Sequence, residues 1–147
     1  MSITVRDARP EDEADFLRLW AEYLAFYRKT LDPEITALTW LRIIDRHARI
    51  FARIVERDGQ FAGFAVCVLH DATWHRKPVC YLEDLFVDQA LRGGLGKALI
   101  DDLLSLAKAG GWPKVYWHTE VGNDRARRLY DQYTEADEYV RYTLVVD

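Results

Sequence analysis

The feature that most constrains this chain is a glycine-rich turn between a strand-like segment and an amphipathic one. Residues 79–87 favour a strand, Gly93, Gly94 and Gly96 follow, and residues 95–108 carry apolar side chains at helical spacing. Glycine accepts positive φ and lets a ligand approach the main chain closely. The first turn of a helix adds unpaired N–H groups and the positive end of the helix dipole. These parts, in this order, predict a cradle for an anion such as a phosphate.

Two common phosphate-binding motifs do not fit this turn. A Walker loop requires a hydroxyl residue after Gly-Lys, but Gly96-Lys97 is followed by Ala98, and Leu91 stands where the loop's first glycine belongs. A dinucleotide fingerprint requires a third glycine where Leu99 stands. A turn with a purely structural role is the remaining alternative.

The rest of the chain predicts one domain, residues 1–147, with an α/β (α+β) fold. The expected strands are 3–6, 50–56, 61–69, 79–87, 115–119 and 139–146, and the expected helices are 10–27, 32–47, 95–108 and 124–133. Asp58-Gly59 indicates a hairpin and hence an antiparallel pair, whereas the strand–helix–strand unit from Val79 to Thr119 requires a parallel pair. We therefore expect a mixed, mostly antiparallel sheet with helices on both faces.

Composition and charge exclude several classes of protein. The net charge of −4 argues against a nucleic-acid binder, which is usually basic. No apolar run is long enough for a membrane span, and the first residues do not resemble a signal peptide. Cys67 and Cys80 lie in apolar segments without a further Cys or His at ligand spacing. We expect buried, reduced thiols, no metal site and a cytoplasmic protein.

Two motifs give the chain a resemblance to a known family. The first is the glycine turn from Arg92 to Gly96, and the second is the Asn123-x-x-Ala126-x-x-x-Tyr130 segment that follows the next strand. Together they resemble the pyrophosphate-binding turn and the tyrosine helix of the GNAT superfamily of acyl-CoA-dependent N-acetyltransferases. The resemblance extends over essentially the whole chain and implies the GNAT fold.

Further segments are similar to one branch of that superfamily. Residues 63–65, Trp74 and residues 81–87 resemble the spermidine/spermine and thialysine acetyltransferases, and residues 115–126 resemble the fungal histone and polyamine acetyltransferases. One departure concerns the glycine turn. The family's Gln/Arg position holds Leu91 here, and the arginine comes one residue later, so the loop is one residue short.

The resemblance implies acetyl-CoA as co-substrate. Its expected binding residues are Leu85, Phe86, Val87, Arg92, Gly93, Gly94, Leu95, Gly96, Lys97, Asn123 and Tyr130. Main-chain groups of residues 85–87 would bind the pantetheine arm as an added strand does, and amides of the turn would bind the diphosphate. Asn123 is expected both to cap its helix and to contact the pantetheine arm.

Acetyl transfer to an amine requires removal of a proton from the ammonium and a proton for the departing thiolate. The resemblance implies Glu83, acting through a water, as the base and Tyr130 as the acid. Strict alternation would place Glu83 and Asp84 on opposite faces of the strand. The expected acceptor-binding residues are Asp84, Trp74, Tyr27 and His118. Each of these residues also has a plain structural reading, as a solvated acid, a packed ring or a hydrogen-bonding histidine.

The expected function is therefore transfer of acetyl to a primary amine by direct attack in a ternary complex. The acceptor stays open among polyamines, lysine-like or other amino acids and protein lysines, and an aminoglycoside-like or amino-acid toxin is a rival acceptor. The alternative from another class is a non-catalytic acyl-CoA-binding sensor. The apolar segment 139–146 predicts pairing across a homodimer edge.

Overall fold

The computed structural model describes residues 1–91 and 93–147. Its strands are β1 (Ile3–Asp7), β2 (Ile50–Arg57), β3 (Gln60–His70), β4 (Val79–Val87) and β5 (Val115–Tyr116). They form one sheet in the order β1-β2-β3-β4-β5. Neighbouring strands are antiparallel except β4 and β5, which are parallel. The prediction of a mixed, mostly antiparallel sheet is confirmed.

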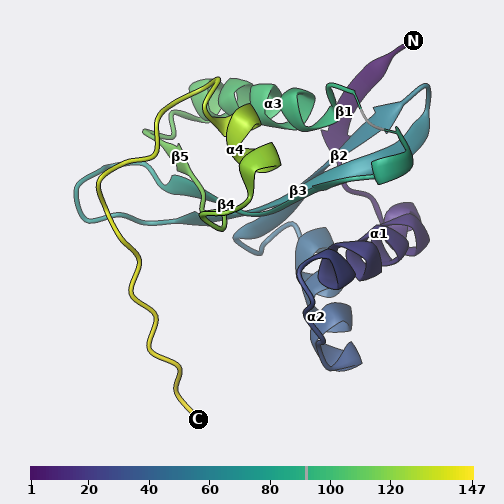
Figure 1. Cartoon of the computed structure of the whole chain (residues 1–147), viewed down its shortest axis with the longest axis horizontal. Helices are drawn as coiled ribbons and strands as arrows, with labels where there is room; N and C mark the ends of the chain where they lie inside the picture. The colour runs from purple at the N-terminus through teal and green to yellow at the C-terminus, as the bar shows by residue number, and fades with distance from the viewer. Residues whose placement is uncertain (92) are drawn as a thin grey trace.

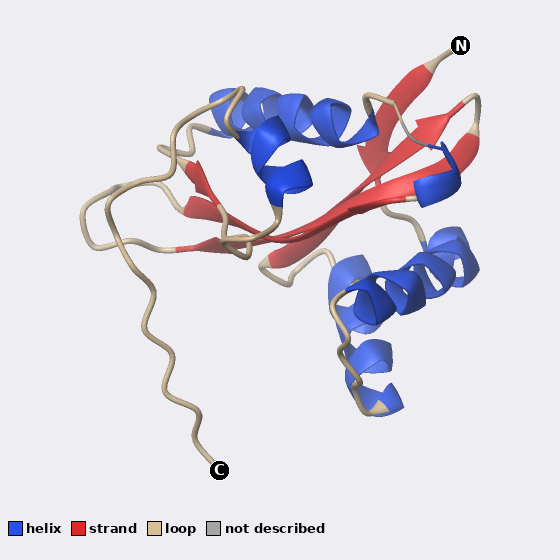
Figure 2. Cartoon of the chain, in the orientation of Figure 1, coloured by secondary structure: helices blue, strands red, loops and turns tan. Residues whose placement is uncertain are grey.

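The helices cover both faces of this sheet, as predicted. They are α1 (Glu13–Phe26), α2 (Pro33–Ile44), α3 (Leu95–Gly110) and α4 (Asp124–Tyr130), with short 3-10 turns η1 (Pro10–Asp12) and η2 (Gln89–Leu91). In Figure 1, α1 and α2 lie on one side of the sheet and α3 and α4 on the other. Figure 2 shows the same layers by type of structure.

Local signals set the helix ends. The Asp32 side chain accepts a hydrogen bond from the Glu34 amide at 3.0 Å, and Pro33 follows as the first residue of α2, where its missing N–H costs nothing. Gly111 takes a left-handed conformation with φ of 72° and ends α3. At the other end of α3, Gly94 is also left-handed, which brings the glycine turn directly onto the helix N-terminus.

Two apolar cores hold the layers together, one on each face of the sheet. The core under α1 and α2 contains Phe16, Trp20 and Trp40, packed on Phe64 and Phe86 of the sheet. The core under α3 is aliphatic: its buried members include Leu95, Leu99, Leu103, Val55, Ala65 and Leu82. The helical stripes seen in the sequence thus become the buried faces of their helices.

A bulge in β4 breaks the alternation expected for residues 81–87. Val66 pairs with Asp84 and the next residue of β3, Cys67, pairs with Leu82, so Glu83 is an extra residue in β4. Leu82 therefore packs in the core under α3, whereas Phe86 packs in the core under α1 and α2. Regular alternation would place Leu82, Asp84 and Phe86 on one face, and this expectation is wrong because a bulge shifts the pleat by one residue.

The predicted last strand at 139–146 is also wrong. Residues 134–147 contain no helix or strand, and their side chains are exposed: Tyr142 is 91% exposed and Leu144 is 89% exposed. The reason is a missing neighbour, since a strand needs an edge to pair with and β5 spans only Val115–Tyr116. The segment leaves the body of the molecule as an extended tail (Figure 1).

Two other predicted elements are shorter than expected. The strand at 115–119 is confined to β5, and the helix at 124–133 ends at Tyr130, with turns in the following three residues. Among the described residues, no helix is both long and apolar enough to cross a membrane.

Candidate active site

A pocket of about 380 Å³ opens beside the glycine turn, between the end of β4, the start of α3 and α4. Ten of the eleven residues predicted to bind the cofactor line it: Leu85, Phe86, Val87, Gly93, Gly94, Leu95, Gly96, Lys97, Asn123 and Tyr130. The eleventh, Arg92, lies outside the described residues. Tyr27, predicted to bind the acceptor, also lines this pocket. The structure thus brings together segments that are far apart in the sequence.

The glycine turn has the backbone geometry that the sequence suggested. Gly93 and Gly94 have φ of 114° and 78°, which side-chain-bearing residues rarely adopt. Two cationic residues, Lys97 and Arg125, are among the pocket's lining residues. Arg57 of β2 reaches the turn as well and donates a hydrogen bond to the Gly93 carbonyl. Unpaired amides at the start of α3, with positive charge close by, can hold a phosphate group.

β4 and β5 diverge at the pocket. They pair only at Cys80–Val115 and Tyr81–Tyr116, so residues 82–87 of β4 have no strand neighbour on that side among the described residues. The segment 85–87, which lines the pocket, therefore presents main-chain groups to it. An extended ligand can bind such an edge in the manner of an additional strand.

Tyr130 ends α4 with its ring edge-on to Trp117, at 5.4 Å between ring centroids. Burial, and to a lesser degree the nearby Tyr27, raises the pKa of Tyr130 to about 12, so its hydroxyl carries a proton at neutral pH. Asn123 accepts a hydrogen bond from the Ala126 amide at 3.3 Å and caps α4, as predicted. Tyr130 thus brings a protonated hydroxyl, which is able to donate a hydrogen bond, to the pocket wall.

The two β4 acids, Glu83 and Asp84, differ in their surroundings. Glu83 is exposed and makes no hydrogen bond or ion pair with the described residues. Asp84 is half-buried, and the Tyr23 hydroxyl donates a hydrogen bond to its Oδ1 at 2.6 Å. Burial, reinforced by the negative charge of Glu83, raises the pKa of Asp84 to about 6, although the Tyr23 hydrogen bond opposes this effect.

A cluster of aromatic rings continues from these acids along β4 and β5. Tyr81 and Tyr116 stack at 5.0 Å, and Nδ1 of His118 lies 3.3 Å from the Tyr81 hydroxyl. His70 Nε2 lies 2.7 Å from the Tyr116 hydroxyl. Trp74, in contrast, is 88% exposed on its loop. Of the residues predicted to bind the acceptor, Tyr27 alone lines the pocket, His118 belongs to the neighbouring cluster, and Trp74 stays apart from both.

Sequence reasoning missed several residues at this site. No sequence pattern indicates that Arg57 lies at this site, because it belongs to a hairpin strand that is far from the glycine turn in the sequence. From the sequence, Tyr23 was one of several aromatic residues that could line an amine pocket or pack in the core, and its hydrogen bond to Asp84 was not foreseen. Arg125 sits inside the Asn123–Tyr130 motif at a position that the motif leaves open, so the pattern could have suggested it.

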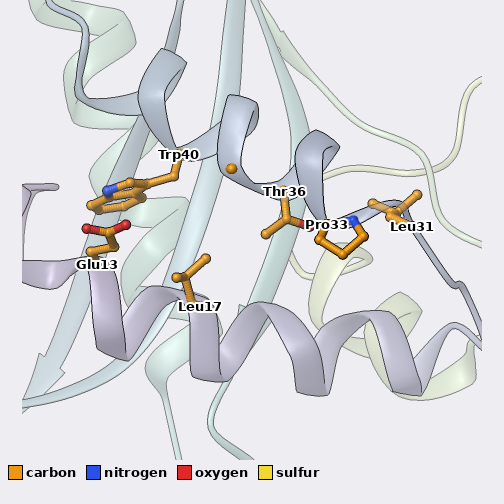
Figure 3. Close-up of a pocket in the computed structure, with 7 residues that line it drawn as sticks. Glu13, Leu17, Leu31, Pro33, Thr36 and Trp40 are labelled. Carbon is orange, nitrogen blue, oxygen red and sulfur yellow. The ribbon is translucent and has the colours of Figure 1, made fainter.

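A second cavity, of about 370 Å³, lies between α1 and α2. Figure 3 shows the Glu13 carboxylate facing the Trp40 indole at one end and Leu31 with Pro33 at the other. The cavity contains none of the residues predicted for the site and lies across the sheet from α3. Among the described residues, no cluster of His, Cys, Asp or Glu suits a metal ion.

Comparisons with known proteins agree with this geometry. Residues 13–133 match the acetyltransferase (GNAT) family. The chain is 34% identical over 143 residues to the D-amino-acid N-acetyltransferase HPA3 of Saccharomyces cerevisiae, covering 95% of this chain and 89% of the relative. It is 29% identical to the uncharacterized N-acetyltransferase YhfO of Bacillus subtilis, covering 98% of each chain.

Solved structures show the same fold. A ribosomal-protein-alanine N-acetyltransferase from Brucella melitensis superposes with a TM-score of 0.83 at 20% identity, over 99% of this chain and 100% of that one. An aminoglycoside acetyltransferase from a soil metagenome superposes with a TM-score of 0.79 at 17% identity, over 99% and 97% of the two chains. At these identities the likeness concerns the fold alone.

Proposed function

This chain belongs to the GNAT family and is an acetyl-CoA-dependent N-acetyltransferase, and we propose that its acceptor is the primary amine of a small molecule, with the α-amino group of a free amino acid as the leading class. The acceptor class is suggested by the HPA3 relative, whose name specifies D-amino acids. The finer resemblance to polyamine acetyltransferases makes diamines the second class to test.

The observation that supports the donor side of this function is that ten residues predicted to bind the cofactor line one pocket. In the proposed complex, amides of Gly94 and Gly96 bind the diphosphate, and the segment 85–87 binds the pantetheine arm. The thioester then reaches Tyr130 at the pocket wall. Tyr130, protonated at neutral pH, donates to the departing thiolate.

The acceptor side is proposed to lie beyond Tyr27, over the acids of β4 and the ring cluster of Tyr81, Tyr116 and His118. Carboxylates attract an ammonium group and aromatic faces bind cations. One of the two acids accepts the ammonium proton, and the free amine then attacks the thioester carbonyl in a ternary complex.

Two measurements test this function. Coenzyme A is expected to raise the unfolding temperature of the protein, whereas ATP at the same concentration is expected to raise it less. Release of free thiol from acetyl-CoA is then measured with a panel of D- and L-amino acids, diamines and an aminoglycoside. Stabilisation by coenzyme A without thiol release for any acceptor would indicate the non-catalytic sensor instead.

The homodimer and the cytoplasmic location are also proposals. The exposed tail at 139–146 is rich in residues with high strand propensity, which suits pairing with a second copy of the chain. Cys67 and Cys80 are buried and free, which suits a reducing compartment. Removal of residues 137–147 is expected to convert the dimer into a monomer in sedimentation, and an unchanged mass would refute the pairing.

A further inference from the structure

Asp84 occupies an unusual position for a carboxylate on a sheet. The bulge at Glu83 directs Asp84 towards α1, where the Tyr23 hydroxyl donates to its Oδ1 at 2.6 Å. The Tyr23 ring is fixed by its neighbours, with ring centroids 5.2 Å from Trp20 and 5.6 Å from Phe86. The carboxylate is therefore held in one orientation by a donor that cannot easily move.

The charges around Asp84 are all negative or neutral. The titratable groups that interact electrostatically with it are Tyr23 of α1, Tyr27 at the C-cap of α1, Glu83 and Tyr81 of β4 and, from the other face of the sheet, Cys67 of β3. No lysine or arginine pairs with Asp84 in the described part of the chain. A carboxyl group in such surroundings can accept a proton at pH values near 6, because burial disfavours its charged form.

Asp84 also lies close to the proposed reaction centre. Leu85, the next residue, lines the cofactor pocket, and so does Tyr27. Tyr27 interacts electrostatically with both Asp84 and Tyr130. Tyr27 therefore lies near both Asp84 and the phenol proposed to protonate the thiolate. Glu83, in contrast, is exposed and has no partner within residues 1–91 and 93–147 that would fix its orientation.

Building on the proposed function, we propose that Asp84 rather than Glu83 receives the proton of the acceptor ammonium, and that Tyr23 is a positioning residue which orients its carboxylate. The ammonium gives its first proton to Asp84, which passes it to solvent. The lone pair of the amine attacks the thioester carbonyl carbon and the C–S bond breaks. Tyr130 protonates the thiolate, and the second proton of the attacking nitrogen restores the phenol.

The test is the pH profile of kcat/KM for the acceptor, measured by thiol release at saturating acetyl-CoA. Asp84→Asn is expected to lower kcat/KM about 100-fold or more while coenzyme A still raises the unfolding temperature. Tyr23→Phe removes a donor to the ionised carboxylate, so the acid limb moves to higher pH by about half a unit or more. Glu83→Gln removes a nearby negative charge, so the limb moves to lower pH and activity at pH 8 persists.

Tyr133→Phe is the matched control. The Tyr133 hydroxyl also donates to a carboxylate at 2.6 Å, that of Asp101, but between α4 and α3 and away from the acceptor side. Its loss is expected to leave the acid limb in place. A Glu83→Gln variant without activity beside an active Asp84→Asn variant would overturn the inference and leave the transferase function intact. A wild-type chain that releases no thiol with any acceptor would refute the transferase function itself.

Discussion

The two ends of the proposed active site, one for the cofactor and one for the acceptor, are built in different ways. At the cofactor end, the pocket is made from a glycine turn, a helix N-terminus and a short helix, each formed by residues close together in the sequence. At the acceptor end, Asp84 of β4 meets Tyr23 of α1, which is sixty-one positions away. The first end relies largely on main-chain groups, whereas the second relies on individual side chains.

This difference indicates which end keeps its chemistry when side chains are substituted. A cradle of backbone amides keeps its shape as long as the glycines remain, since side chains contribute little to it. A side-chain site changes its chemistry with one substitution. We therefore expect the donor to be fixed by the fold and the acceptor to be set by a few residues near β4.

Tyr130→Phe is expected to have the largest effect on turnover. It distinguishes the two ends most clearly, because it should impair acetyl transfer without weakening the binding of coenzyme A. The ring and its contact with Trp117 are kept, but the proton for the thiolate is lost. We expect kcat to fall about 100-fold while the Kd for coenzyme A, measured by calorimetry, stays within about twofold. A variant with wild-type kcat would show that the thiolate leaves without this acid.

Asp84→Asn should stabilise the protein while it damages catalysis. The pKa of Asp84 is about 6 in the folded chain, above its ordinary value of 3.8, so ionisation opposes folding. Below pH 3.8 the carboxyl is protonated in both the folded and the unfolded chain, so folding carries no ionisation penalty. The penalty grows as the pH rises from 3.8 to 6 and is complete above pH 6. We expect the variant to be more stable by about 3 kcal/mol at pH 8 and by about half as much at pH 5, in urea unfolding.

Asp101→Asn is the control for that measurement. Hydrogen bonds from Lys97 and Tyr133 lower the pKa of Asp101, so its ionised form is favoured by folding. Its replacement is expected to bring no gain in stability at either pH. A gain in both variants would mean that general charge repulsion, rather than burial of Asp84, is the cause.

Gly94→Val tests the cofactor end. A side chain at φ of 78° strains the turn and moves the amides that we propose bind the diphosphate. The Kd for coenzyme A is expected to rise about tenfold or more. Gly59→Val in the β2–β3 hairpin has nearly the same φ, 81°, and open space around it, so it should cost stability without changing this Kd. Equal losses of affinity would contradict the cradle.

Trp74→Ala is expected to have the smallest effect. The ring is 88% exposed, so its removal should leave the unfolding temperature unchanged. An exposed cation–π contact is worth about 0.5–1 kcal/mol, which corresponds to a two- to fivefold rise in the acceptor KM. The KM for acetyl-CoA serves as the internal control. An unchanged acceptor KM would remove Trp74 from the acceptor site.

The sequence could predict, for a physical reason, that the residues proposed to bind the cofactor lie around one pocket. Glycines at positive φ, a helix start and a capping asparagine are local devices, and each leaves a mark at a fixed spacing. The mixed sheet with helices on both faces followed from the hairpin at Asp58-Gly59 and from the parallel strand–helix–strand unit that begins with β4.

The acceptor end was harder to predict because its geometry depends on long-range pairing. The bulge at Glu83 is visible only when Val66 and Cys67 of β3 are aligned with β4. A pattern of alternating residues predicts the face of each side chain only while the pairing is regular. The prediction of a strand at 139–146 failed for a related reason, because strand propensity alone does not supply a neighbouring strand with which the segment could pair.

The extra residue in β4 also has a consequence for insertions and deletions. Leu82 before the bulge and Leu85 after it both contact the aliphatic layer, although an odd number of positions separates them. Loss of Glu83 would close the bulge and leave Leu82 and Leu85 on the aliphatic side of a regular strand, with Asp84 still on the side of α1. Deletion scanning under selection for solubility should therefore find loss of Glu83 better tolerated than loss of a residue from the regularly paired part of β4, where a deletion reverses the face of every side chain beyond it.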